Sequence, residues 1–338
     1  MRKWLLILRQ PGSYRIILGI LLVSGLTIGT LAGGNLTKFR PEEMDYEHQQ
    51  VPPEPAWLLK LMTTESGRKI LLQSRSGGGV NTPGTSSDDE DIGFLNGKDS
   101  AKVSDGYEFF RGHGHILGTD RNGRDMVALL VAGARNCFLP GLVACAMALG
   151  LGIPLGLLAG YYGGRWRRGV QILSGTLLSL PRMVLILVVI CALEPNVYLT
   201  MAVLGLTLVP RVSELILTRV SILSKMGFIL AAKEGGLSDF RILTRHLFWY
   251  QNRAVFFIQF SLIMAESILT ETTLSYLQFG TKPPDVSWGN IIEGSRLTFF
   301  SGNYWITFFP AAAIILAILG FFYLGDGMNA RLSYREGR

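Results

Sequence analysis

The sequence TRVSILSKMGFILAAKEGGLSDFRILTRHLFWYQN, residues 218–252, is a polar and basic segment between two long apolar segments. A segment of this polarity is expected to leave the hydrocarbon core of a bilayer. Its first part has helical periodicity, and the Gly235-Gly236 pair that follows is typical of a helix end, because glycine readily adopts a positive φ. Ser238 or Asp239 is predicted to cap a second helix.

The two predicted helices around the glycine pair are amphipathic. The apolar positions are Ile222, Met226, Ile229 and Leu230 in the first helix, and Phe240, Leu243 and Leu247, which are predicted to share one face, in the second. Helix, glycine break and amphipathic helix together indicate a docking element that presents an apolar ridge to a soluble partner. The alternative interpretation is an ordinary solvated loop.

The composition indicates a membrane protein. Of 338 residues, 49% are hydrophobic and only 17% are charged, and the net charge is +7. Positive loops on the inner side of a membrane account for this charge, and basic residues interleaved with aromatic ones, as in nucleic-acid binding, are not evident. Cys137, Cys145 and Cys191 lie in apolar segments without metal-ligand spacing, and we predict that they are buried as small hydrophobic residues.

Apolar runs of the length that a bilayer requires predict an all-α integral membrane protein with about six transmembrane helices. The predicted spans cover residues 16–34, 137–162, 170–193, 197–217, 254–277 and 304–324. A cleaved signal peptide is the alternative for the first of them. Gly156 and Gly160 are spaced for close helix packing in the second span. Basic residues at both ends of the chain and in the 218–252 segment predict that the N- and C-termini are cytoplasmic.

The polar residues 35–112 form a long segment between the first two spans. Its Gly-, Ser- and Asp-rich part, residues 76–106, is predicted to stay mobile. The acidic run 88–91 and the pair His113 and His115 lack the spacing or additional ligands of metal sites, which favours solvated charge and a polar loop.

Residues Phe228 to Asp239 resemble the cytoplasmic EAA loop of ABC-transporter inner-membrane permeases of the dipeptide/oligopeptide/nickel type, the C-type permease subunit. Leu230 and Trp249 stand where that family has Glu and Pro. By this resemblance residues 218–253 are the coupling loop, which contacts the ATPase. Its expected coupling residues are Ala231, Ala232, Gly235, Gly236, Ser238, Asp239, Arg241 and Arg245.

Further motifs follow in the order of the same family. Residues 115–125 resemble H-x-[LF]-G-T-D-x-x-G-R-D, and we predict a turn and a helix start at Thr119 or Asp120. The motifs that follow are Gly133-Ala134-Arg135, Glu271 to Gly280, Ser287-Trp288-Gly289 and Gly325-Asp326-Gly327. Pro283-Pro284 and Trp288 are predicted to form an outer turn with the tryptophan at headgroup level.

The resemblance implies a multi-pass permease subunit in a bacterial cytoplasmic (inner) membrane, pairing with a second homologous permease subunit. Two cytoplasmic P-loop ATPase subunits and an extracytoplasmic substrate-binding protein would complete the importer. The expected organisation is a cytoplasmic N-terminus and first transmembrane helix over 1–34, a long polar extracytoplasmic loop over 35–135 and the permease transmembrane domain over 136–330. No catalytic residue, metal site or cofactor is expected, and the chain has no G-x-x-x-x-G-K-[ST] loop.

Charged residues inside the predicted spans mark a substrate pathway or pair helices, and both interpretations stay open for Arg182, Glu266 and Glu271. Arg211 and Glu214 are spaced for an intrahelical ion pair.

Peptide is the favoured substrate, with nickel or another small solute as the alternative within the family. A stand-alone channel or secondary carrier would use the same carboxylates without an ATPase. A membrane enzyme lacks support, because the chain has no H-E-x-x-H or G-x-S-x-G motif.

Overall fold

The computed structural model describes residues 13–36, 44, 49–53, 115, 117–193, 196–282 and 284–336, and these residues are almost entirely helical, which confirms the predicted all-α class. The predictions for the acidic run, for His113 and for most of the 35–112 segment lie outside them. The helices are α2 (Ser13–Leu36), α6 (Met126–Tyr162), α7 (Gly164–Leu178), α8 (Arg182–Ala192), α9 (Val197–Leu223), α10 (Gly227–Glu234), α11 (Asp239–Arg241), the π-helix η2 (Ile242–Asn252), α12 (Arg253–Tyr276), α13 (Trp288–Phe299) and α14 (Trp305–Glu336).

Long apolar helices stand at the predicted spans. Within the described residues, α6, α9, α14 and the helix that runs without a break through α11, η2 and α12 are each long and apolar enough to cross a membrane. The helix α2 stands where the first span was predicted. The second span begins at Met126, earlier than the predicted residue 137, and the last continues to Glu336.

The third span is broken, and its prediction as one continuous helix over 170–193 was wrong. Helices α7 and α8 meet at an angle of 79°. Pro181 is the N-cap of α8 with extended backbone angles, and proline cannot donate the hydrogen bond that would continue α7. The break places Arg182 at the first position of α8.

Glycines on α6 allow α9 to approach closely, as the small-residue spacing predicted. A Cβ atom at Gly156 would lie 2.6 Å from the Ser213 carbonyl oxygen, and one at Gly160 would lie 2.7 Å from the Val220 Cβ. On α9, a Cβ atom at Gly205 would lie 2.6 Å from the Ala144 carbonyl oxygen. The backbones of α6 and α9 therefore lie so close together that larger side chains at these glycine positions would prevent the contact.

Replacing Gly156 with leucine is expected to destabilise the α6–α9 packing, because the side chain would overlap the backbone of α9. Overpacking typically costs about 1–3 kcal/mol. Gly150 on the same helix is the matched control, since a Cβ atom there would meet nothing within 4 Å. Thermal unfolding in detergent should show a lower midpoint for Gly156→Leu than for Gly150→Leu. Equal midpoints would show that the close contact is not needed.

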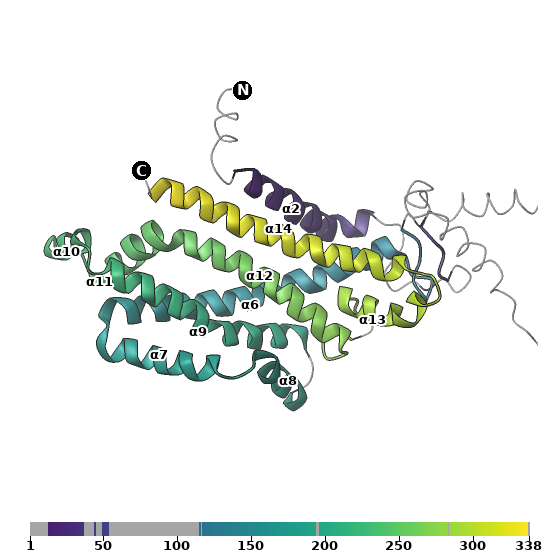
Figure 1. Ribbon diagram of the computed structural model, residues 1–338, viewed down its shortest axis with the longest axis horizontal. Coiled ribbons are helices and arrows are strands. Elements are labelled where there is room, and N and C mark those ends of the chain that lie inside the picture. The colour runs from purple at the N-terminus through teal and green to yellow at the C-terminus, as the bar shows by residue number, and fades with distance from the viewer. Residues whose placement is uncertain are drawn as a thin grey trace, which may run out of the picture. The chain divides into compact units, whose positions relative to one another are not determined.

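The helices α2 and α14 lie side by side (Figure 1). A Cβ atom at Gly19 would meet the backbone nitrogen of Leu324 at 2.6 Å, so this contact also depends on a glycine. Arg15 forms an ion pair with Asp326. The Gly325-Asp326-Gly327 motif thus has a physical role, which is to join the last span to the first helix.

The chain divides into two compact units, one with most of the helices and one that comprises residues 39–128 and 294–308. In the second unit, Asp120 accepts hydrogen bonds from the backbone N–H groups of Asn122 and Arg124, both at 2.8 Å, and pairs with the Arg124 guanidinium at 2.7 Å. This confirms the predicted turn. The helix start was misplaced, since Asp125 is the residue that caps α6, accepting from the Ala128 N–H at 2.9 Å. His115 Nδ1 lies 3.0 Å from an Asp125 carboxylate oxygen, which holds that cap in place.

Trp288 is fully buried, so its predicted position at headgroup level was wrong. Its indole N–H donates to the Leu130 carbonyl at 2.9 Å, and a Cβ atom at Gly133 would lie 2.6 Å from the indole Cδ1. The Gly-Ala-Arg and Ser-Trp-Gly motifs are thus the two sides of one packing contact. The helix α13, which begins at this tryptophan, was not predicted.

Candidate functional site

The coupling loop contains the predicted glycine break. Helix α10 ends at Gly235, and Gly236 has a φ of 77°. The N–H of Gly236 donates to the Lys233 carbonyl and that of Leu237 to the Ala232 carbonyl, both at 3.1 Å. These two bonds with a left-handed glycine form a Schellman motif, which satisfies the last carbonyls of a helix. The loop lies beyond the neighbouring end of α12, at the same end as the last turns of α14 (Figure 1).

The loop exposes three large apolar side chains, which together we name the apolar ridge: Phe228, Leu230 and Phe240. Phe240 is 75% exposed whereas Leu243 and Leu247 are buried, so the prediction that the three residues share one face was wrong. The reason is the π-helix that begins at Ile242, which changes the angle between successive side chains.

The first loop helix is shorter than predicted. Helix α9 continues to Leu223, and α10 begins only at Gly227, with Met226 as its N-cap. Ile222 therefore belongs to α9 and is exposed, whereas Ile229 is buried and anchors α10.

Most of the predicted coupling residues are accessible to a partner. Asp239 and Ala232 are half-buried, and the exposed ones are Ala231, Gly235, Gly236, Ser238, Arg241 and Arg245. Lys233, Arg241 and Arg245 are exposed on the same loop, so the loop offers both apolar area and positive charge.

Of the two predicted caps, Ser238 or Asp239, the N-cap position of α11 is taken by Ser238, and Asp239 instead joins the coupling loop to the end of α6. Its carboxylate accepts a hydrogen bond from the Tyr161 hydroxyl at 2.6 Å and one from the Tyr162 hydroxyl at 3.3 Å. Ser238 is the N-cap residue but makes no side-chain capping bond. A hydrogen bond to an ionised carboxylate is stronger than one between neutral groups. The tyrosines were not predicted, because they lie far from Asp239 in the sequence and no local spacing points to them.

The second charged feature lies inside the spans. Glu266 of α12 accepts hydrogen bonds from Arg182 of α8 on one carboxylate oxygen and from Arg211 of α9, at 3.2 Å, on the other. We name these three residues the arginine–glutamate cluster. The predicted pair of Arg211 with Glu214 was wrong, since Arg211 reaches across to α12 instead. The broken third span brings Arg182 to this position.

Glu271 occupies a different environment, in which it is almost fully buried. Its carboxylate accepts hydrogen bonds from the hydroxyls of Ser275 at 2.6 Å and Thr281 at 3.0 Å, and from the Cys137 thiol at 3.0 Å. These contacts join α12, the turn that follows it and α6. The arrangement favours helix pairing over a pathway role for Glu271.

Among the cysteines, Cys191 is exposed, against the prediction that all three are buried.

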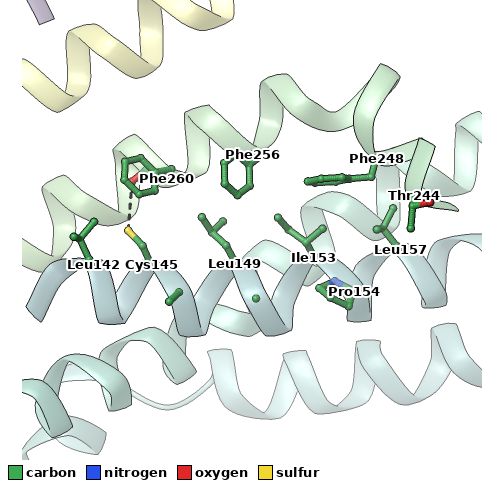
Figure 2. Close-up of a pocket in the computed structure, with 12 residues that line it drawn as sticks. Leu142, Cys145, Leu149, Ile153, Pro154, Leu157, Thr244, Phe248, Phe256 and Phe260 are labelled. Carbon is green, nitrogen blue, oxygen red and sulfur yellow. Dashed lines mark hydrogen bonds between the residues drawn. The ribbon is translucent and has the colours of Figure 1, made fainter. Parts of the chain in front are cut away.

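An apolar groove of about 510 Å³ lies between α6 and the helix formed by η2 and α12 (Figure 2). Leu149 and Ile153 of α6 face Phe256 and Phe248 across it. The residues that line it carry no charged side chain, so it is chemically distinct from the arginine–glutamate cluster.

These features define a multi-pass helical membrane protein with an exposed polar loop at one end and charged side chains inside its spans. Residues 152–336 match the family model described as "Binding-protein-dependent transport system inner membrane component". The chain belongs to this family. It is therefore a permease subunit of an ABC importer in the inner membrane, a transporter component rather than an enzyme.

The chain is similar to several named permease proteins over most of their length. The chain is 29% identical to the probable D,D-dipeptide transport system permease protein DdpC of Escherichia coli (strain K12), over 66% of the chain and 74% of the relative. It is 32% identical to the dipeptide transport system permease protein DppC of Alkalihalophilus pseudofirmus, over 64% and 71%. The glutathione transport system permease protein GsiD of Pectobacterium atrosepticum is 28% identical, over 64% and 72%.

Proposed function

We propose that this chain forms half of the translocation pathway of an ATP-driven importer of peptides. A second homologous permease subunit forms the other half, two P-loop ATPase subunits dock on the coupling loops, and an extracytoplasmic binding protein delivers the substrate. The observation that carries the proposal is the coupling loop, whose exposed apolar side chains lie on both sides of a hydrogen-bonded glycine turn. Apolar area of this kind on a polar loop is typical of a protein–protein contact.

Two connections lead from the coupling loop into the spans. Asp239 is bonded to Tyr161 at the end of α6. The helix from Asp239 to Tyr276 is continuous, so displacement of the loop also moves α12. Closure of the ATPase dimer would therefore shift both helices as rigid bodies, which is the motion that alternating access requires.

The substrate class rests on the relatives, whose names specify dipeptides, D,D-dipeptides and glutathione. All of these are short molecules with amide bonds and at least one carboxylate. A peptide of a few residues is accordingly the proposed substrate, and nickel or another small solute is the alternative that the transport assay below distinguishes.

The proposed topology places both termini and the coupling loop in the cytoplasm, with residues 35–135 outside. Single cysteines at the exposed positions Lys225 and Lys282, in a chain that lacks Cys191, test it. An impermeant maleimide is expected to label position 282 in intact cells and position 225 only after lysis. The reverse pattern would refute this topology.

The function is tested by purifying the tagged chain with its bound subunits and reconstituting the complex with its binding protein in liposomes. We expect peptide to stimulate ATP hydrolysis and to accumulate inside. Stimulation by nickel and not by peptide would assign the alternative substrate. Flux through the chain alone, without an ATPase, would contradict the importer function.

A further inference from the structure

The arginine–glutamate cluster lies inside the spans, away from the ends of α9 and α12. Arg211 is 14 residues after the first residue of α9 and 12 before the last (211 − 197 and 223 − 211). Glu266 is 10 residues before the end of the continuous helix Asp239–Tyr276 (276 − 266) and farther from its start. At a rise of about 1.5 Å per residue, Arg211 is roughly 18–21 Å from the ends of α9, and Glu266 is roughly 15 Å from the nearer end of its helix. The third member, Arg182, stands at the break of the bent α7–α8 span.

The cluster is unbalanced in charge and in hydrogen bonding. Two guanidinium groups share one carboxylate, which leaves one positive charge in excess. A guanidinium has five N–H donors, and the side chains of Arg182 and Arg211 each make one described bond, to Glu266. Glu214, one turn further along α9, forms no ion pair among the described residues. Donors of both arginines therefore remain available.

The cluster is also accessible from outside the subunit. The side chains of Arg182, Arg211 and Glu266 are 33%, 48% and 24% exposed. Exposure of such groups to lipid at this depth is costly, so ionised residues inside spans face a water-filled cavity or another protein. The face that carries the cluster therefore turns toward a water-filled cavity or toward the second permease subunit, and the apolar groove of Figure 2 is made of other residues.

We propose that Arg211, together with Arg182, binds a carboxylate of the transported solute inside the pathway. Glu266 holds the two guanidinium groups in place and leaves their remaining donors directed at the solute. A guanidinium binds a carboxylate through two parallel hydrogen bonds, a geometry that lysine cannot reproduce. This inference rests on the proposed function, in which the solute is a short peptide with a free C-terminal carboxylate.

The first experiment compares uptake of one peptide in its free-acid and C-terminally amidated forms by the reconstituted complex. Concentrations are set so that the binding protein is equally loaded with each form. We expect Arg211→Gln to lower uptake of the free acid about tenfold or more, because loss of a hydrogen bond to a charged group weakens binding by about that factor. Uptake of the amide should stay unchanged. Arg211→Lys should restore only part of the loss.

Arg168→Gln is the matched control, because Arg168 is an exposed arginine of α7 outside both the cluster and the coupling loop. It should not change the ratio between the two peptides. If Arg211→Gln lowers uptake of both peptides equally while the complex still assembles, the proposal is overturned and the cluster is assigned to helix pairing or to contact with the second permease subunit. Unchanged uptake of both peptides would also overturn it.

A second measurement does not depend on peptide transport. A cysteine at Thr207, one turn before Arg211 on α9 and half-buried, is labelled in a chain that lacks Cys191. An anionic methanethiosulfonate reagent should react faster than a cationic one by about tenfold, because a positive site in a low-dielectric wall concentrates anions. The preference should disappear in Arg211→Gln. Equal rates in the unsubstituted cluster would refute the subsite, whereas failure of the complex to import any peptide would refute only the peptide function.

Discussion

Replacing Gly236 with valine is expected to abolish substrate uptake while the protein still inserts into the membrane. The φ of 77° at Gly236 is unfavourable for any residue with a Cβ and more so for a β-branched one, at a cost on the order of 2 kcal/mol. A cost of this size shifts the turn out of its native conformation by a factor of about ten or more. The turn orients α10 against α11, so the apolar ridge would no longer match the ATPase surface.

The effect at this position is conformational rather than steric, since a Cβ atom at Gly236 would meet nothing within 4 Å. Gly227 is the matched control, because it also has open space around it but does not have a positive φ. The measurement is the ratio of peptide uptake to ATP hydrolysis in the reconstituted complex. Uptake by Gly236→Val at the level of Gly227→Val would contradict a role for this turn in coupling.

The second large effect is expected from Tyr161→Phe, which removes the hydroxyl that donates to Asp239 at 2.6 Å. Hydrogen bonds to charged groups contribute about 1.5–3 kcal/mol, so the connection between α6 and the coupling loop should weaken by about tenfold or more. We expect ATP hydrolysis to continue with several-fold less uptake. The fold of the spans should be retained, because Tyr161 is at the last turn of α6.

Tyr162→Phe is the control for this prediction, since its hydroxyl is more exposed and lies 3.3 Å from the same carboxylate. Its effect on uptake should be small. Asp239→Asn should resemble Tyr161→Phe, and the double variant should be no worse than either single one, because the two residues act through one contact. Additive losses would show that Tyr161 and Asp239 act independently.

The local features of the coupling loop could be predicted from the sequence. The Gly235-Gly236 pair indicated the end of α10 because only glycine takes the required φ without strain. The glycine spacing on the second span likewise indicated a close helix contact, and α9 makes it at Gly156 and Gly160. In the first case the physical cause lies within a few residues of the signal, whereas in the second the spacing indicates a close helix contact without indicating which helix makes it.

The long-range contacts could not be predicted in this way. Asp239 and Tyr161 are 78 residues apart, and Arg211 and Glu266 are 55 apart, so their pairing depends on which helices become neighbours. Trp288 has the composition of an interfacial anchor, yet it is buried because Gly133 leaves room for its ring. The outward position of Phe240 follows from the π-helix, for which a single sequence gives no clear signal.

The two departures from the family loop also have a structural interpretation. Trp249 stands where the family has proline, and a residue with a backbone N–H allows one helix to run from Asp239 to Tyr276. The Asn252 side-chain amide donates to the Leu247 carbonyl at 2.8 Å within this π-helical part. Leu230, in place of glutamate, adds apolar area to the ridge.

The central claim is that the apolar ridge of the coupling loop docks an ATPase, and photo-crosslinking tests it most directly. A photoreactive amino acid is placed at Phe240, which is 75% exposed, and at Phe300, an 86% exposed phenylalanine outside the loop, as the control. Mass spectrometry of the adducts from intact membranes is predicted to find a P-loop ATPase at position 240 and not at position 300. Adducts at position 240 that contain only lipid or other copies of this chain would contradict the claim.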